Sequence, residues 1–426
     1  MSTHDAVGIG FGPANLALAI ALEEEPAGVD IHFIEAQPDP VWQGGMLLDR
    51  SDIQNHPCRD LVTLRNPRSR YTFINYLFEQ DRLVEHLNLP MEFPLRKEYA
   101  GYIRWATGHF AHLVDLGVAA GRVALAGPPD RPVYEVHTSD GRCLTARALV
   151  LGCGRTPLVP APFDAVRSPR VVHLTRYLDT VRQLPRPPGS VAVVGGSQSA
   201  VELVLDLSRR FPDARVVNYL RAPGPRLKDT SPFSEEAFFP SFTDYYFNAS
   251  RAGKNTLDAL LRPTNYSTTD GDVLKELYIS IYEQRLDGHQ RVFVAGNRVV
   301  DSATAHEHGV ELAVRELHTG VVTHDLVDLV VLATGFRDLG PGPHQEPYPP
   351  LLHEVVDRFR FDDDGYLVVN ADYSLAPHDA RTPPLFLNGL CESTHGLGDA
   401  GSFSLLSVRA ATIHHSLGKR MGGANG

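Results

Sequence analysis

Three glycines and a proline near the start of the chain have the spacing of a dinucleotide-binding turn: Gly8, Gly10, Gly12 and Pro13. We expect Gly8 to allow the tight turn and Gly10 to let the backbone approach a pyrophosphate. The apolar run that follows is typical of a helix, whose first N–H groups and positive dipole end favour a phosphate. The next strand, 30–34, is followed by Glu35, which stands where an acidic side chain bonds a ribose hydroxyl. The pattern predicts a dinucleotide site, and the competing interpretation is a tight turn before an ordinary helix.

A second turn of the same kind follows the proline-rich linker 184–189. Its residues are Gly195, Gly196, Ser197, Gln198, Ser199 and Ala200. Ser197 stands where a middle glycine is usual, and a serine hydroxyl still donates to a phosphate. The strand after this turn ends in Arg221, where an acid would select NADH; an arginine there pairs with a ribose 2′-phosphate, unless it is an ordinary surface charge. The two turns together predict two dinucleotides, FAD at the first and NADPH at the second.

Strands, glycine turns and helices alternate around both motifs. This order predicts an α/β protein with two Rossmann-like dinucleotide-binding domains. We expect an FAD-binding domain at 1–165 and 336–426, and an NADPH-binding domain at 187–224 and 288–335. Residues 225–287 are rich in proline and aromatic residues and then helical in pattern, so they predict a small, mostly helical insert with substrate contacts.

Four further segments have readable patterns. Apolar spacing predicts a helix running through residues 73–83, and a second, amphipathic helix over 92–106 that starts after Pro94. Residues 133–154 predict a hairpin that turns at an Asp-Gly pair. Residues 325–335 predict one strand that ends at an Ala-Thr-Gly turn.

Composition excludes several functional classes. A chain of 426 residues is too long for one compact core, so two or three domains are expected. Its net charge of −11 argues against nucleic acid as a partner. No window reaches the ~18 uninterrupted apolar residues of a membrane span. The four cysteines are scattered without a CxxC pair, which argues against a dithiol redox motif and a cysteine zinc site and fits a reducing cytoplasm. We therefore expect a cytoplasmic protein with no metal, no membrane and no nucleic-acid partner.

Several blocks of sequence resemble one family, the flavin-dependent N-hydroxylating monooxygenases of siderophore biosynthesis, typified by ornithine and lysine N-monooxygenases. The blocks occur in the family's order and cover nearly the whole chain: GIGFGPANLALAIALEE, GGMLL, DLVTLRNPRSRYTFINYL, FPLRKEYAGYIRW, NYSTTD, LATGF and THGL. The resemblance implies FAD and NADPH as cofactors, O₂ as co-substrate, and hydroxylation of a terminal primary amine. Family members are often dimers or tetramers, which makes a homo-oligomer one expectation, although no segment marks an interface.

The implied chemistry places few demands on side chains. Reduced flavin and O₂ form a flavin hydroperoxide, and a neutral primary amine attacks its distal oxygen. The flavin carries the reaction, so we nominate no catalytic side chain; the protein supplies position and excludes water. Trp42 and Gln54 match family positions near the flavin, and simple packing is the alternative for both.

Four residues correspond to substrate contacts of the family: Arg59, Glu235, Asn265 and Ser404. In the amino-acid N-monooxygenases a lysine binds the substrate carboxylate where this chain has Arg59. A family asparagine shares that carboxylate where this chain has Glu235. Asn265 is retained, and Ser404 roughly matches a family serine, although the loop before it carries one extra residue.

The change to Glu235 alters the expected substrate. A carboxylate repels a substrate carboxylate and attracts an ammonium. The first interpretation is therefore a diamine such as putrescine or cadaverine, or another decarboxylated amine such as histamine. The alternative is that Arg59 and Glu235 pair with each other and that an amino acid, L-ornithine or L-lysine, is the substrate and binds differently.

Three other classes share parts of the pattern. A Baeyer–Villiger flavin monooxygenase has both glycine turns, but its FxGxxxH block is missing here. A disulfide reductase needs a cysteine pair near the flavin, and a non-catalytic binding protein would be expected to lose Arg221 or the substrate-facing block. The sequence favours the N-hydroxylating enzyme over all three.

Overall fold

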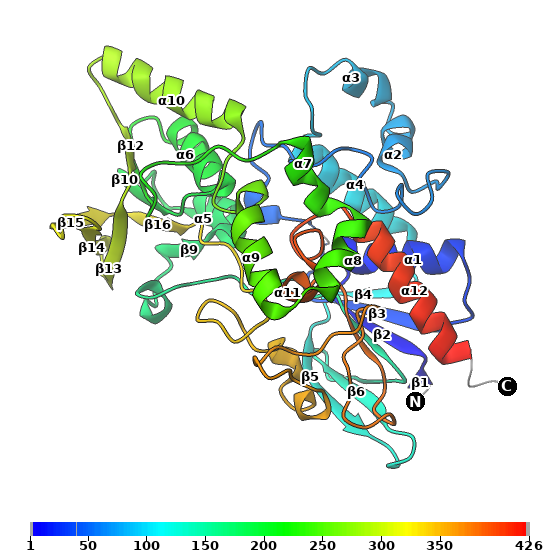
Figure 1. Ribbon diagram of the computed structural model, residues 1–426. Coiled ribbons are helices and arrows are strands. Elements are labelled where there is room, and N and C mark those ends of the chain that lie inside the picture. The colour runs from blue at the N-terminus through cyan, green and yellow to red at the C-terminus, as the bar shows by residue number, and fades with distance from the viewer. Residues whose placement is uncertain (1–2, 40, 423–426) are drawn as a thin grey trace.

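The computed structural model describes residues 3–39 and 41–422, and its first sheet forms the base of the FAD-binding unit (Figure 1). The five strands are all parallel, in the order β17-β8-β2-β3-β4. They are β2 (Ala6–Ile9), β3 (Ile31–Glu35), β4 (Val114–Leu116), β8 (Leu149–Leu151) and β17 (Leu385–Leu387). The carboxyl ends of β2, β3 and β8 meet at one edge, which is where open parallel sheets bind ligands.

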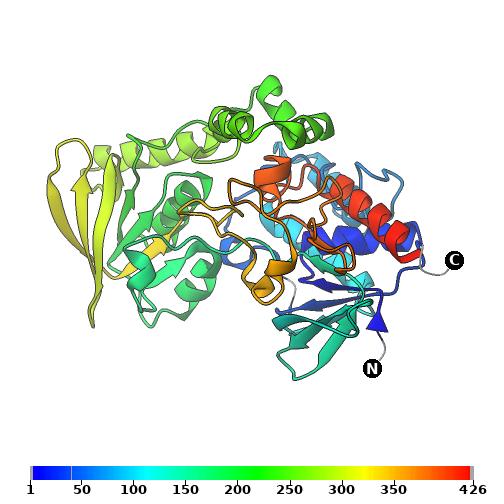
Figure 2. The same cartoon turned by 60° about the horizontal axis from the view of Figure 1, so that its bottom comes forward.

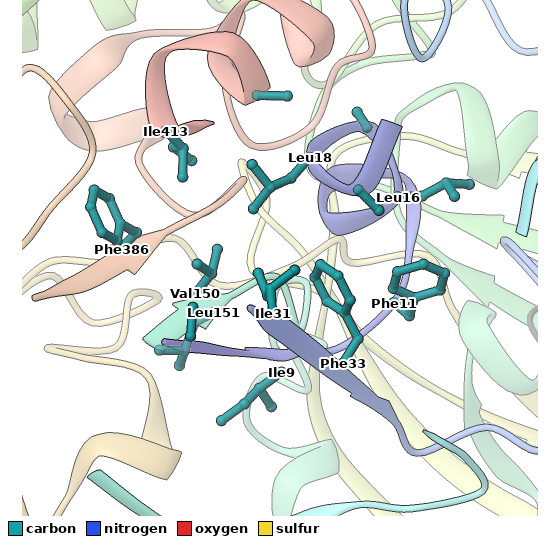
Figure 3. Packing of buried hydrophobic residues seen from close by; sticks show 14 of the residues in the cluster. Ile9, Phe11, Leu16, Leu18, Ile31, Phe33, Val150, Leu151, Phe386 and Ile413 are labelled. Carbon is teal, nitrogen blue, oxygen red and sulfur yellow. The ribbon is translucent and has the colours of Figure 1, made fainter. Parts of the chain in front are cut away.

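Two helices from opposite ends of the chain cover one face of this sheet. The helix α1 (Pro13–Glu24) packs beside α12 (Leu406–Gly422), as Figures 1 and 2 both show. Figure 3 shows the resulting core, in which Phe33 of β3 lies beside Phe11, with ring centroids 4.8 Å apart. Strands β2 and β8 are buried along their full length, because both faces of the sheet are covered.

A mixed four-stranded sheet shares this core and has the order β1-β7-β6-β5. Its strands are β1 (Thr3–His4), β5 (Ala120–Ala126), β6 (Val133–Thr138) and β7 (Cys143–Ala146). Strands β6 and β7 form the predicted hairpin, with Gly141 in the turn at φ +84°. The prediction was wrong beyond residue 146, because β8 leaves the hairpin and pairs in parallel with β2 and β17. Its three residues are fully buried, and a central parallel strand provides that burial.

A helical excursion between β3 and β4 contributes aromatic side chains to the same core. It contains α2 (Phe73–Glu79), α3 (Leu83–Leu87) and α4 (Arg96–His109), together with the short turn η1 (Gly44–Met46). The single helix predicted through 73–83 is interrupted, because Asp81 takes a left-handed conformation at φ +56°. The helix predicted over 92–106 is present but begins at Arg96 and runs on to His109.

The second parallel sheet forms the base of the NADPH-binding unit, in the order β12-β11-β10-β16-β9. Its strands are β9 (Val171–His173), β10 (Ser190–Val194), β11 (Arg215–Tyr219), β12 (Val292–Ala295) and β16 (Leu329–Leu332). Helices α5 (Tyr177–Gln183), α6 (Gln198–Arg210) and α10 (Gly271–Leu286) pack on it. Strand β9 and helix α10 belong to this unit but lie outside the predicted ranges 187–224 and 288–335, which favours wider limits. The domain limits remain a prediction.

A three-stranded antiparallel sheet lies at the far end of the second unit (Figure 2). It consists of β13 (Arg298–Ala305), β14 (Val310–Glu316) and β15 (Val322–Val327), and the first two strands were not predicted. The prediction of one strand over 325–335 was wrong. The extended segment is interrupted at Asp328, which separates β15 from β16. The Asp328 carboxylate accepts hydrogen bonds from the N–H groups of Gly189 at 2.7 Å and Ser190 at 3.0 Å.

The segment between β11 and β12 is helical, as expected. Before α10 it contains α7 (Pro232–Glu235), α8 (Pro240–Asn248) and α9 (Arg251–Leu261), which Figure 2 shows along the upper edge of the molecule. Helix α8 contacts α11 (Glu392–His395), which follows the last strand of the first sheet. The α/β fold with two parallel sheets is therefore confirmed. Within residues 3–39 and 41–422, no helix combines the length and apolar character needed to cross a membrane.

Candidate active site

The first glycine turn is built by Gly10 rather than by Gly8. Gly10 has φ +84°, and a Cβ there would lie 2.6 Å from the carbonyl oxygen of Gly152. Gly8 lies inside β2, where a Cβ would lie 2.1 Å from the ring of Phe33. The expectation that Gly8 allows the turn was therefore wrong: its missing side chain makes room for Phe33, and Gly10 makes the turn.

The space in front of helix α1 is open. A Cβ on Gly12 would meet no described atom within 4 Å, and the helix begins at the next residue, Pro13. An open approach to the first turn of a helix is what a pyrophosphate requires. The residues of this turn therefore fit the pyrophosphate of FAD.

Asn15 holds this turn in place and was missed at the level of sequence. Its Nδ2 donates to the carbonyl oxygen of Gly10 at 2.7 Å, and its Oδ1 accepts from Asn388 at 3.0 Å. The side chain is fully buried. The sequence does contain one indication of this role, because Asn15 is the only polar residue of the apolar run 13–22.

Glu35 ends β3 at the same edge of the sheet. Its carboxylate accepts N–H bonds from Phe11 at 2.7 Å and from Gln37 at 2.8 Å. Each carboxylate oxygen keeps a second lone pair, so both can accept a further hydrogen bond from a ribose hydroxyl. These two backbone contacts orient Glu35 for that role.

The second glycine turn leads into α6. Gly195 has φ +149°, and a Cβ there would lie 2.3 Å from the carbonyl oxygen of Ala333. Ser197 is the N-cap of α6, and within the described ranges neither its hydroxyl nor that of Ser199 has a hydrogen-bond partner. Both hydroxyls are thus available to a phosphate. Gln198 differs, because its side chain is buried between Glu202 and the backbone of Asp270.

Arg221 follows β11 at the edge of the sheet where α6 begins. Its side chain is exposed, and no described residue pairs with it. An unpaired guanidinium at this position fits the 2′-phosphate of NADPH. The role remains a prediction.

Arg59, Glu235 and Ser404 come together from three parts of the chain. The Nη1 of Arg59 lies 3.7 Å from Oε2 of Glu235 and donates to the Ser404 hydroxyl at 3.2 Å. The Arg59 and Glu235 side chains are 27% and 28% exposed, so a ligand can reach both. The structure thus contains the pairing of Arg59 with Glu235 that was left open as an alternative.

Lys228 and Asp270 complete this charged cluster, and neither was singled out from the sequence. Nζ of Lys228 lies 3.8 Å from Oδ1 of Asp270, and both side chains are mostly buried. Burial raises the pKa of Glu235 above its ordinary value, and the nearby charges of Lys228 and Arg59 oppose that rise. Two cations therefore act on the Glu235 carboxylate.

Gln54 and Trp42 lie next to this cluster. Gln54 takes a left-handed conformation at φ +52°, and its side-chain amide donates to Asp270. Trp42 packs edge-on against Phe403, with ring centroids 5.1 Å apart, and Phe403 immediately precedes Ser404. Gln54 therefore contacts the charged cluster directly, and Trp42 reaches it through Phe403, while the flavin-side role of both remains a prediction.

Asn265 lies in the turn between α9 and α10. The residue is half-buried, and no described residue bonds its side-chain amide. A free amide at this position can bond a substrate amine, as the family pattern implies. Its neighbour Tyr266, by contrast, is fixed by several contacts.

One group of side chains among the described residues has the spacing of a metal site, namely Glu135, His137 and Cys143 on the β6–β7 hairpin. The Arg122 guanidinium lies 3.3 Å from Nε2 of His137 and already places a positive charge there. The group lies outside the cluster around Arg59. All four cysteines are free thiols.

Known proteins resemble this chain along almost its whole length. The family model described as L-lysine 6-monooxygenase/L-ornithine 5-monooxygenase matches residues 2–338. The L-ornithine N(5)-monooxygenase of Pseudomonas aeruginosa is 35% identical, over 97% of this chain and 93% of the relative.

Two solved structures are also similar. The ornithine N-hydroxylase of Kutzneria sp. 744 is described with reduced FAD, NADP⁺ and L-ornithine. It is 33% identical with a TM-score of 0.90, and the match covers 98% of this chain and 100% of that chain. The cadaverine monooxygenase of Erwinia amylovora, described as bound to FAD, has a TM-score of 0.84 at 25% identity, covering 98% and 95%. The family model over residues 2–338 and the relative at 35% identity show that the chain belongs to the L-lysine 6-monooxygenase/L-ornithine 5-monooxygenase family of flavin-dependent N-hydroxylating enzymes.

Proposed function

We propose that this FAD- and NADPH-dependent monooxygenase N-hydroxylates the side-chain amine of L-ornithine or a closely similar α-amino acid. The observation that carries the proposal is the pairing of Arg59 with Glu235 at 3.7 Å in a ligand-accessible position. An α-amino acid head group carries a carboxylate and an ammonium on one carbon. Arg59 would bind the carboxylate, with Ser404 beside it, and Glu235 would bind the ammonium.

The charges around the anchor support this choice. Arg59 and Lys228 offset Glu235 and Asp270, so the cluster of four is neutral when all are ionised. A zwitterionic head group leaves that balance unchanged, whereas the remote ammonium of a diamine adds a positive charge to a half-buried site. An isolated Glu235 carboxylate would favour a diamine, but the positive charges of Arg59 and Lys228 reduce its attraction for a lone ammonium. The ornithine enzymes among the relatives point the same way.

The reaction takes one amine, O₂, NADPH and a proton, and yields a hydroxylamine, water and NADP⁺. Bound flavin supplies the redox chemistry, as FAD does in monooxygenases generally. The chain's residues hold the amine in position: the head group at Arg59 and Glu235, and the side-chain nitrogen at the free amide of Asn265. The product suits hydroxamate and siderophore biosynthesis.

A diamine remains the second candidate because of Glu235 itself. The carboxylate occupies a position where the amino-acid enzymes carry an amide, and it attracts a lone ammonium. The relative from Erwinia amylovora is described as a cadaverine monooxygenase. This candidate predicts that removing the substrate carboxylate improves turnover.

A substrate series separates the two candidates. Purified enzyme with NADPH would be given L-ornithine, L-lysine, putrescine, cadaverine, histamine and 5-aminopentanoate, and hydroxylamine product would be measured. Putrescine lacks only the carboxylate of ornithine, and 5-aminopentanoate lacks only its α-ammonium. We expect kcat/KM to be highest for ornithine and to fall for both truncated compounds. A higher value for putrescine than for ornithine would favour the diamine.

The variant Glu235→Gln adds a matched test, since glutamine keeps the size and removes the charge. It should lower kcat/KM for ornithine about tenfold, as expected for losing a charge-assisted hydrogen bond, and leave 5-aminopentanoate nearly unchanged. An equal loss for both compounds would contradict the contact between Glu235 and the α-ammonium.

A further inference from the structure

A buried polar cluster lies beside the candidate site, where four segments of the chain meet. Its members are Arg155 after β8, Tyr266 in the insert, Asp338 after β16 and Glu392 at the start of α11. The side chains of Arg155 and Glu392 are only 13% and 11% exposed. None of these residues was identified from the sequence as functional.

The hydrogen bonds of the cluster connect Arg155 to Glu392 through Tyr266 when Glu392 is ionised. Nη1 of Arg155 donates to the Tyr266 hydroxyl at 3.0 Å and to Asp338 at 2.8 Å. The Tyr266 hydroxyl donates its single proton to Oε2 of Glu392 at 2.6 Å. Glu392 is therefore the acceptor that fixes the orientation of Tyr266.

Two predicted substrate contacts depend on this arrangement. Tyr266 immediately follows Asn265, and Ser267 after it is held in a left-handed conformation at φ +59°. On the other side, a Cβ on Gly401 would lie 2.8 Å from Nη2 of Arg155 and 3.2 Å from the Tyr266 hydroxyl. Gly401 belongs to the loop that leads to Ser404. The cluster therefore supports both the Asn265 turn and the Ser404 loop.

The charges of the cluster are unequal. One guanidinium, Arg155, faces two carboxylates, Asp338 and Glu392, while Asp399 adds a further negative charge nearby. Burial, helped by Asp338 and Asp399, raises the pKa of Glu392 to about 8, against the opposing effects of Arg155 and Tyr266. Glu392 therefore gains and loses its proton near neutral pH.

We propose that Glu392 is a positioning residue for N-hydroxylation, which acts through Tyr266 to keep Asn265 aimed at the bound amine. The proposal rests on the function proposed above, in which Asn265 bonds the amine nitrogen. An ionised carboxylate accepts the Tyr266 hydrogen bond more strongly than a neutral carboxyl group. The hydrogen bond from Tyr266 to Glu392, and with it the position of the Asn265 turn, should therefore become more stable as the pH rises through the pKa of Glu392.

The test compares three variants of the FAD-loaded enzyme. Glu392→Leu removes the acceptor, and Glu392→Gln keeps an oxygen acceptor but cannot ionise. Glu346→Gln is the matched control, because Glu346 is another partly buried carboxylate outside the cluster, which accepts a hydrogen bond from Thr156 and has no described hydrogen bond with Tyr266. For each, the KM for ornithine, the hydroxylamine formed per NADPH consumed, and the rate of flavin reduction by NADPH would be measured.

Glu392→Leu should raise the KM for ornithine about tenfold and lower the product formed per NADPH, with flavin reduction within about twofold of wild type. Glu392→Gln should restore most of the product yield. In wild type the KM for ornithine should fall as the pH rises through the pKa of Glu392, and Glu392→Gln should lack this fall. Changes in KM that come from the ionisation of ornithine itself should be present in both enzymes. Glu346→Gln should resemble wild type in product per NADPH.

An unchanged KM and product yield in Glu392→Leu would overturn the proposal. An equal loss of flavin reduction and product would also overturn it, because that pattern indicates a structural defect. If Glu392→Leu loses FAD, the pH profile of Glu392→Gln decides: a profile identical to wild type overturns the proposal, and loss of the transition supports it. Absence of hydroxylamine from wild type with every amine would overturn the proposed function and this proposal together.

Discussion

Arg96 and Glu202 join the two dinucleotide-binding units through a buried two-pronged ion pair. Nη1 and Nη2 of Arg96 donate to the two carboxylate oxygens of Glu202 at 2.9 and 3.0 Å, and the side chains are 8% and 6% exposed. Arg96 begins α4 in the FAD unit, and Glu202 lies in α6 of the NADPH unit. Arg96 also donates to the carbonyl oxygens of Met46 and Asp52. The pair therefore fixes the NADPH unit against the segment 46–52 of the FAD unit.

Replacing one partner of this ion pair should lower the free energy of unfolding more than replacing both partners with apolar residues. Glu202→Ala leaves the Arg96 charge buried without a counterion, which costs about 3–5 kcal/mol in the free energy of unfolding. The double variant Arg96→Met/Glu202→Leu should recover a large part of that loss. Urea denaturation of the two variants and wild type measures both effects. Equal stability of Glu202→Ala and wild type would contradict the coupling of the two units by this pair.

Gly12 should matter for FAD rather than for folding. A Cβ there meets no described atom within 4 Å, so Gly12→Ala should leave the melting temperature of the apoprotein nearly unchanged. The added methyl would occupy the approach to α1 and weaken FAD binding, which fluorescence titration of the apoprotein measures. Gly108→Ala is the control, since Gly108 also has open space at its Cβ position and lies in α4. Unchanged FAD affinity in Gly12→Ala would show that the pyrophosphate lies elsewhere.

Arg221 should set the preference for NADPH. Arg221→Ala removes a charge-assisted contact with the 2′-phosphate, so the KM for NADPH should rise about tenfold or more while the KM for NADH stays the same. Arg186→Ala is the control, because Arg186 is exposed in the linker before β10, at the opposite end of the parallel sheet. Parallel losses with both nucleotides would show that Arg221 does not bind the 2′-phosphate.

Glu392 should make stability depend on pH. Its pKa is raised to about 8 from the ordinary 4.5, so the folded chain keeps a proton that the unfolded chain has lost. The free energy of unfolding should therefore fall as the pH rises through that interval, since the folded state binds more protons there. Glu392→Gln should show a shallower fall than wild type when urea midpoints are compared across the interval. Superimposable profiles would mean that Glu392 ionises normally in the folded protein.

Local motifs allowed much of the site to be predicted from the sequence. Gly10, Glu35 and Arg221 each lie at the end of a strand or just after it, so residue type and spacing within one short segment are enough to predict their positions. The role of Gly8 was assigned wrongly because its constraint comes from Phe33 on the neighbouring strand, and spacing along one segment does not contain that contact.

Contacts between distant segments were harder to predict. Lys228 and Asp270 are polar residues in an irregular part of the insert, and a short parallel bridge between Leu227 and Thr269 brings them together. Glu392 and Tyr266 are 126 positions apart, so nothing in either segment indicates the other. Strands β13 and β14 were missed because their alternating, partly exposed pattern is weaker than that of the buried parallel strands.

One measurement tests the proposed chemistry most directly, namely the fate of isotopically labelled O₂ in the presence of NADPH and L-ornithine. We expect one labelled oxygen atom on the side-chain nitrogen of ornithine for nearly every NADPH consumed, and much less labelled product from putrescine. NADPH oxidation that yields hydrogen peroxide without label in ornithine, under conditions where FAD is bound, would contradict N-hydroxylation of this amino acid.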